Sequence, residues 1–179
     1  MGRRSEVAVS NLVACSFIQP WLWAILEHQK GVAIRGQFLA VENRSWRPDR
    51  LMLGRKIALH ASAKWDRGGA RFIRRTLATL GLEAKAPPAS SAPRGAILGS
   101  AMLVAAMRKE GSRGEVVGPI VDGDADLLAA SPWSFGPWIW VLGDVHELPK
   151  PVPCKGALGI WRVPEEVAAR VRELELAHG

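Results

Sequence analysis

The stretch RKIALHAS, residues Arg55–Ser62, has the clearest strand pattern in this sequence of 179 residues. Ile57, Leu59 and Ala61 fall on one side of an extended chain, and such alternation is typical of a half-buried β-strand. Other runs rich in Val, Ile, Leu and Phe lie on both sides of this stretch. They predict further strands at Val7–Ile18, Gln37–Glu42, Ala96–Met107, Val116–Val121, Trp138–Leu142 and Ala157–Val163.

Three helices are predicted among these strands. Asp66 can cap a basic helix over Gly69–Leu80, and Gly81 can end it. A helix over Trp21–His28 begins after a proline, which suits a first helical turn. A C-terminal helix at about 164–177 also begins at a proline and has glutamates in its first turn.

The remaining segments are predicted as loops. Residues 31–36 connect two elements, and residues 84–94 form an exposed loop rich in Ala, Pro and Ser. Asp122–Asp126 resembles the opening of a calcium loop but lacks the later Gly and Glu, so an exposed acidic loop is predicted. Strands mixed with few helices, without regular alternation, indicate one α+β domain over residues 1–179, with a curled sheet or small barrel.

The positive charge is concentrated in one part of the chain. The segment Val41–Arg75 holds ten basic and three acidic residues, so it carries the whole net charge of +7. Eight of those ten are arginines, which suit bidentate contacts with phosphate. Nucleic acid is therefore the leading partner class, with an ordinary solvated surface as the alternative. The basic residues singled out here for binding are Arg44, Arg47, Lys64, Arg71, Arg74 and Arg75.

Composition excludes several other classes of protein. Two distant cysteines, Cys15 and Cys154, form neither a disulfide framework nor a cysteine-based zinc site. No apolar run reaches the length of a membrane span, and no Walker A, GxGxxG, GxSxG or HExxH motif occurs. We therefore expect a soluble cytoplasmic protein without a metal, a cofactor or a membrane partner.

The aromatic residues are unusual, because the chain has eight tryptophans and no tyrosine. Flat rings suit the stacking of bases, although most tryptophans in a small domain belong to the core. Pro-Trp pairs occur at 20–21, 132–133 and 137–138, where rigid turns can present the rings. The aromatic candidates for ligand contact are Trp21, Trp46, Trp133, Phe135 and Trp138.

Several motifs in a fixed order resemble the ASCH family, whose relatives include the PUA, EVE and YTH domains. They are QPWLWAIL (Gln19–Leu26), VENRSWR (Val41–Arg47), IALHAS (Ile57–Ser62), SPWSFGPWIWVL (Ser131–Leu142) and PVPCKGALGIW (Pro151–Trp161). The resemblance spans about Ala14 to Trp161. It implies a PUA-like mixed β-barrel with flanking helices and a cleft for RNA or a modified nucleoside. Some members of the family are RNA-processing hydrolases.

The chain departs from the family at the hydrolase residues. Members with that activity use a lysine just ahead of the Val-Glu-Asn-Arg motif and a threonine three residues on. Without a gap, Leu39 and Glu42 stand at those positions. With about ten inserted residues up to Ala40, the lysine is Lys30. Neither alignment recreates a lysine–threonine pair, and it stays open whether residues 31–40 cover the cleft.

The polar candidates each have two interpretations. Glu42 and Arg44 project to the same side of a strand, where they can read a base edge and bind phosphate or form a structural ion pair. His60 can be a base-reading or general-base group, or a hydrogen-bonded core histidine. If the protein is an enzyme, the acid/base candidates are Glu42, His60 and Lys64.

Three functions follow from these observations. The first is a binding module for RNA, other nucleic acid or a modified nucleotide. Its cleft would be lined by Gln19, Trp21, Glu42, Arg44 and Trp46 and closed by the segment Ser131–Trp138, with Lys30 as a further binding candidate. The second is a metal-independent hydrolase of RNA or a modified nucleoside, of ribonuclease or amidohydrolase type. The third is a protein-interaction subunit whose basic helix docks an acidic partner.

Overall fold

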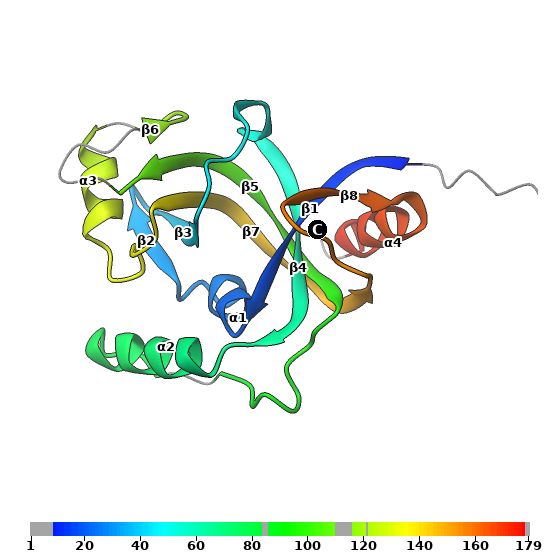
Figure 1. Ribbon diagram of the computed structural model, residues 1–179, viewed down its shortest axis with the longest axis horizontal. Helices are drawn as coiled ribbons and strands as arrows, with labels where there is room; N and C mark the ends of the chain where they lie inside the picture. Colours follow the sequence, from blue (N-terminus) through cyan, green and yellow to red (C-terminus); the bar gives the residue numbers. More distant parts are fainter. Residues whose placement is uncertain (1–8, 84–85, 110–115, 121, 178–179) are drawn as a thin grey trace, which may run out of the picture.

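The computed structural model describes residues 9–83, 86–109, 116–120 and 122–177 (Figure 1). Its elements are β1 (Val9–Gln19), α1 (Trp21–Leu26), β2 (Gly31–Ile34), β3 (Gln37–Arg44), a short 3-10 helix (Arg50–Met52), β4 (Arg55–Trp65), α2 (Arg67–Thr79), β5 (Ala96–Arg108), β6 (Val116–Val117), α3 (Asp122–Ala130), β7 (Trp138–Pro153), β8 (Ile160–Pro164) and α4 (Glu165–Leu176).

The strands form one curled sheet in the order β2-β3-β7-β5-β4-β1-β8, with β6 paired to β5 (Figure 1). β1 runs parallel to β4, and the other paired strands are antiparallel. Register shifts interrupt the long β5–β7 pair at three places, and bulges of this kind bend strands. The predicted α+β class is confirmed. Among the described residues β2 and β8 remain the ends of the path, so the predicted barrel is not confirmed.

Both faces of the sheet are buried. One core cluster holds residues such as Phe17, Leu59 and Trp140 and lies inside the curl. A second cluster packs α1, α2 and α3 against the opposite side of β3, β5 and β7. A third packs α4 against β1, β4, β5 and β7. Successive side chains of a β-strand point to opposite faces of the sheet. Along β7, Trp140 therefore belongs to the first cluster and its neighbour Val141 to the second.

The helix expected over 69–80 is confirmed as α2, which spans Arg67–Thr79 and has the predicted Asp66 cap and the predicted Gly81 after its end. The Asp66 carboxylate accepts the Gly69 N–H at 2.8 Å, which satisfies one free donor of the first turn. Gly81 follows the helix with φ +72°, a left-handed conformation that suits glycine. The C-terminal helix is also confirmed, with Pro164 at its N-cap.

Two predicted loops are wrong. Residues 31–34 are strand β2, because Arg35 and Gly36 (φ +51° and +80°) make a two-residue hairpin turn and leave the preceding residues free to pair with β3. Asp122–Ala130 is helix α3 rather than an acidic loop, because Ala125 and Leu128 lie one turn apart and pack into the second core cluster.

Some predicted elements differ only in their bounds. The strand predicted at 138–142 extends to Pro153 as β7. Residues 7–8 of the first predicted strand and residues 84–85 of the predicted 84–94 loop lie outside the described residues. Residues 86–94 contain turns and neither helix nor strand. None of the described helices combines the length and the apolar character needed to cross a lipid bilayer.

Candidate functional site

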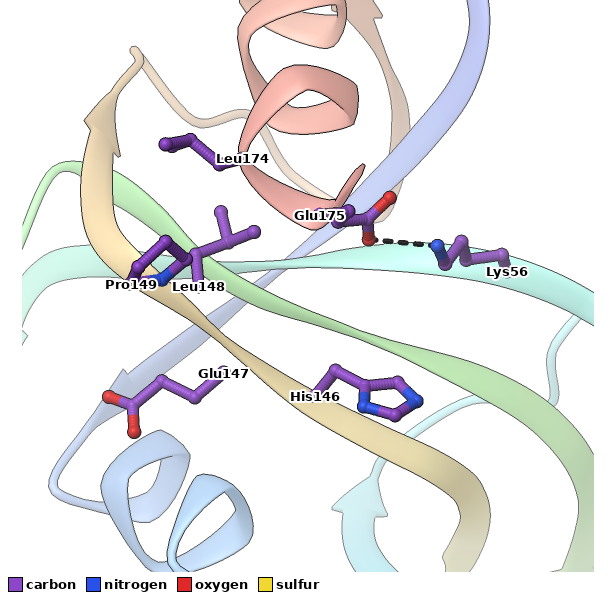
Figure 2. A pocket seen from close by; sticks show the side chains of 7 residues that line it. All are labelled: Lys56, His146, Glu147, Leu148, Pro149, Leu174 and Glu175. Atoms are coloured by element: carbon purple, nitrogen blue, oxygen red, sulfur yellow. Dashed lines mark ion pairs between the residues drawn. The ribbon is translucent and has the colours of Figure 1, made fainter. Parts of the chain in front are cut away.

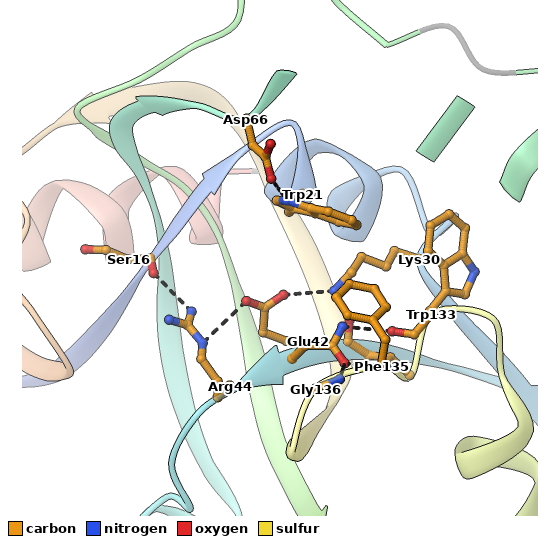
Figure 3. A network of polar contacts seen from close by, with 11 residues as sticks. Ser16, Trp21, Lys30, Glu42, Arg44, Asp66, Trp133, Phe135 and Gly136 are labelled. Carbon is orange, nitrogen blue, oxygen red and sulfur yellow. Dashed lines mark hydrogen bonds and ion pairs between the residues drawn. The ribbon is translucent and has the colours of Figure 1, made fainter. Parts of the chain in front are cut away.

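A cavity of about 280 Å³ opens where β1, α1, β3 and the loop after α3 meet (Figure 3). We call it the base cavity, after the nucleobase that the sequence leads us to expect in a cleft of this kind. Most of its wall comes from the end of β1 and from the VENR motif on β3, which the β2–β3 hairpin positions beside α1. Its lining residues are Ser16, Phe17, Ile18, Trp21, Lys30, Glu42, Asn43, Arg44, Asp66 and Phe135.

A row of three charged side chains crosses the base cavity (Figure 3). Lys30 Nζ lies 2.9 Å from Glu42 Oε2 and also donates to the Val41 carbonyl. Arg44 Nε lies 3.4 Å from the other carboxylate oxygen, Glu42 Oε1. Arg44 also donates to the Ser16 carbonyl at 3.0 Å. The carboxylate of Glu42 is therefore held between two cations.

Burial dominates the chemistry of Lys30, whose side chain is 1% exposed. Burial lowers the pKa of the Lys30 ammonium, and the nearby Glu42 carboxylate opposes that shift. Among the described residues this ammonium donates to two oxygen acceptors, so one of its three N–H groups has no oxygen partner there, and the ammonium nitrogen lies 5.5 Å from the centroid of the Trp21 ring. The Glu42 oxygens can accept hydrogen bonds in the same place.

Aromatic rings form the rim of the base cavity. The rings of Trp21 and Phe135 have centroids 5.6 Å apart, and Phe72 of α2 contacts both. The indole of Trp21 is fixed because its Nε1 donates to Asp66 Oδ2 at 2.9 Å. Phe135 is 52% exposed, so its ring is available to a ligand.

Asn43 joins two of the sequence motifs. Its Oδ1 accepts the N–H groups of Phe135 and Gly136 at 2.9 and 2.8 Å, and its Nδ2 donates to the Trp133 carbonyl at 2.8 Å (Figure 3). The loop that carries Phe135 is thereby fastened to β3. Sequence reasoning missed Asn43, since no local pattern shows which distant loop an asparagine holds.

Asp66 was predicted only as a helix cap, yet it also holds Trp21. Hydrogen bonds hold the pKa of the Asp66 carboxyl below its usual range. The bond from the Gly69 N–H has the largest effect, and the bond from the Trp21 indole N–H adds to it. A Cβ atom at Gly69 would lie 2.5 Å from Trp21 Nε1, so α2 packs directly on the indole. The start of α2 is therefore part of the site.

Gln19 and three of the predicted aromatic binding residues do not line the base cavity. Gln19 is buried and bonds to the Pro93 carbonyl and the Trp23 N–H at 3.1 and 3.0 Å. Trp133 is buried in the second core cluster, and Trp138 packs against the first. Trp46 is 36% exposed and contacts Trp140 edge-on, with ring centroids 4.8 Å apart. Its ring lines a separate surface hollow with Arg55 and Trp161.

His60 and Lys64 line a second cavity of about 580 Å³ next to the base cavity. His60 is buried, and its Nε2 lies 2.9 Å from the Cys154 carbonyl while its Nδ1 lies 3.1 Å from Ser16 Oγ. Burial lowers the pKa of this imidazole. His60 is thus buried in the cavity wall, and both of its ring nitrogens have hydrogen-bond partners in the protein. The three acid/base candidates are divided, with Glu42 in one cavity and His60 and Lys64 in the other.

The basic segment does not form a single surface. Arg71, Arg74 and Arg75 are exposed on α2, whose opposite side carries Ile73 and Leu77 into the core. Lys56 instead pairs with Glu175 of α4 at 2.8 Å, in a hollow beside β7 (Figure 2). Figure 1 shows α2 and α4 well apart. Arg47 is exposed, in the loop after β3.

Residues 31–40 form most of the β2–β3 hairpin. None of the described residues that line the base cavity comes from this segment. The hairpin nonetheless builds the site, because it returns the chain from Lys30 to Glu42.

No protein family model matches the chain, and no curated protein matches it. Among solved structures, its fold is similar to that of a mutant of the ZmASCH protein from Zymomonas mobilis. The two share 12% identity with a TM-score of 0.44, over 92% of this chain and 99% of that one. The likeness concerns the fold alone.

Proposed function

We propose that this protein binds single-stranded RNA or a modified nucleotide, with one base held in the base cavity. The base lies against Trp21 and Phe135, and its polar edge meets Lys30 and Glu42. The adjoining backbone of a longer strand runs past the exposed arginines of α2. A PUA-like arrangement of the curled sheet and its flanking helices belongs to the same proposal.

The observation that carries this proposal is the buried row of Lys30, Glu42 and Arg44 beneath an aromatic rim. A buried ion pair contributes little to stability, because desolvation offsets its attraction. Donors and acceptors fixed beside flat rings are, however, what recognition of an unpaired base requires. The Lys30 N–H can meet a base carbonyl, and the Glu42 carboxylate can accept from an amino or imino group.

The position of α2 supports a strand longer than one nucleotide. Asp66 at its N-cap lines the base cavity, and Phe72 further along the helix contacts the rim. Arg71, Arg74 and Arg75 occupy exposed positions of the same helix. A nucleic acid whose base enters the cavity thus has cations close to its phosphates.

Binding accounts for the geometry better than hydrolysis does. Both carboxylate oxygens of Glu42 face cations, and both ring nitrogens of His60 have partners in the protein. A general base needs a free lone pair within reach of the proton it takes. His60 offers none in this arrangement, and Glu42 lies in a different cavity from His60 and Lys64, so the three candidates do not come together as an acid–base pair.

The test is fluorescence anisotropy of a short labelled single-stranded RNA across a salt series, with the RNA checked on a gel afterwards. Three to five phosphate contacts give a log–log slope of about −2 to −3.5. Phe135→Ala should weaken binding by about 5- to 150-fold, the loss of one stacking ring. Trp46→Ala is the matched control, since that exposed ring lies outside the cavity, and it should bind like the wild type.

Equal effects of Phe135→Ala and Trp46→Ala would contradict the proposed site. Absence of binding at low salt would contradict the proposed ligand. Cleaved RNA would favour a hydrolase over a binding module.

A further inference from the structure

The second cavity shares a wall with the base cavity. Ser16, Ile18 and Arg44 line both. Ser16 and Ile18 lie at the end of β1, and the Arg44 guanidinium bonds to the Ser16 carbonyl between the two spaces (Figure 3). The loop between β7 and β8, residues 154–159, forms the far wall together with the end of β4. The two cavities are therefore adjacent, with Ser16, Ile18 and Arg44 between them.

The two cavities differ in charge. The base cavity has two carboxylates, those of Glu42 and Asp66, and two cations, Lys30 and Arg44, among its lining residues, so its charges balance. The described residues that line the second cavity include three cationic side chains, Arg44, Lys64 and Lys155, and no acidic one. Carboxylates repel a phosphate and accept hydrogen bonds from a base, whereas lysines attract a phosphate. The anionic part of a nucleotide ligand thus belongs on the side of the second cavity.

The second cavity also offers apolar surface. Ile18 and Leu158, which are 40% and 98% exposed, both line this cavity. A ribose or an unstacked base can cover such surface. This favours a whole nucleotide over a bare phosphate ion as the occupant.

The far wall of the second cavity is held in place by hydrogen bonds. His60 binds the Cys154 carbonyl at 2.9 Å, and Ser16 Oγ lies 3.1 Å from the Ala157 carbonyl. The loop packs so closely that a Cβ atom at Gly156 would lie 2.4 Å from His60 Cε1. The cavity is therefore formed before a ligand binds, which reduces the ordering that binding requires.

We infer that the second cavity is a subsite for the neighbouring nucleotide, so that the protein recognises a dinucleotide step of a single strand. The phosphodiester crosses the shared wall at Ser16 and Arg44 and faces Lys64 and Lys155. This inference rests on the proposed function, because it requires a base in the base cavity.

The test compares ribonucleosides with dinucleoside monophosphates by calorimetry. The four ribonucleosides identify the preferred base, and the dinucleotides that contain it are then measured. The added nucleotide should tighten binding by about tenfold or more, the effect of one or two charge-assisted hydrogen bonds. Lys64→Gln combined with Lys155→Gln should abolish that gain and leave nucleoside affinity unchanged. The matched control is Arg170→Gln with Arg172→Gln on α4, which should retain the gain.

Alkylation of Cys154 gives an independent measurement. The Cys15 side chain is fully buried, and burial raises its pKa to about 11. Maleimide should therefore react with Cys154, the more exposed of the two thiols. A bound dinucleotide should slow this reaction, and a bound nucleoside should not.

The outcomes separate the two proposals. Nucleoside binding without a dinucleotide gain, or a gain that survives removal of Lys64 and Lys155, overturns the subsite and leaves the proposed function intact. Unchanged Cys154 alkylation in the dinucleotide complex also overturns the subsite. Failure of both ligands to bind overturns both proposals.

Discussion

Lys30 and Glu42 form a buried ion pair at 2.9 Å across the open end of the β2–β3 hairpin. Gly31 pairs with Ala40 as the outermost residues of that hairpin, and the Val41 N–H bonds to the Lys30 carbonyl at 3.0 Å. The hairpin register therefore brings the two charges together. The predictions below follow from this pair, from the elements that surround it and from the buried His60.

Replacing Lys30 by methionine should destabilise the protein. The methionine side chain would fill similar space but leave the Glu42 carboxylate buried with only the more distant Arg44 as a cation. Removing one partner of a buried pair costs about 3 kcal/mol of unfolding free energy. Urea denaturation of Lys30→Met and wild type measures this loss.

The double variant Lys30→Met with Glu42→Gln provides the control. It removes both charges, so its loss should be at least about 1 kcal/mol smaller than the sum of the two single losses. Additive losses would show that the pair is not coupled, contrary to the structure. Both single variants should also weaken RNA binding, since each removes a group proposed to meet the base edge.

Asp66 should stabilise α2 and hold Trp21 at the same time. Asp66→Ala removes the helix cap, worth about 1 kcal/mol, and leaves the Trp21 N–H without its acceptor. Asp66→Asn retains an oxygen that can cap the helix and should cost less. A urea midpoint that is the same for both variants would contradict the dual role.

The arginines of α2 should contribute to the salt dependence of RNA binding. Changing Arg71, Arg74 and Arg75 to glutamine removes up to three phosphate contacts, so the log–log slope should become less negative by about 2. The affinity for a single nucleoside should not change. Arg170→Gln with Arg172→Gln on α4 serves as the control, and an equal loss of slope there would refute a specific contact with α2.

His60 should make the protein less stable as the pH falls. Burial lowers the pKa of His60 in the folded protein below 6.5, its ordinary value in the unfolded chain. At a pH between the folded and unfolded pKa, the unfolded chain binds a proton at this imidazole and the folded protein does not. Stability is therefore full above pH 6.5 and declines as the pH falls toward the folded pKa. His60→Gln should remove this part of the decline, measured as the urea midpoint against pH. An identical pH profile in the variant would contradict it.

The sequence predicted the elements whose signals are local. Alternating apolar residues indicated the strand at 55–62, and the Asp66 and Gly81 positions indicated the ends of α2. It also placed Trp21, Lys30, Glu42, Arg44 and Phe135 in a common site, and all five line the base cavity.

What the sequence could not predict depends on long-range contacts. The side chain of Asn43 meets a loop 90 residues away, and Asp66 meets Trp21 across 45 residues. Trp46 and Trp133 are tryptophans like Trp21, so the sequence alone does not distinguish the three. Packing places Trp46 in a separate surface hollow and Trp133 in the core. Helix α3 was missed because its acidic start resembled a metal-binding loop.

The most direct test of the account follows the indole N–H signals of the eight tryptophans by NMR as a short single-stranded RNA is added. Trp21→Phe and Trp46→Phe identify the two signals of interest. A base held in the base cavity should shift the Trp21 signal progressively and leave the Trp46 signal in place. A Trp46 signal that moves while that of Trp21 does not, or RNA binding that moves neither, would contradict a base held in this cavity.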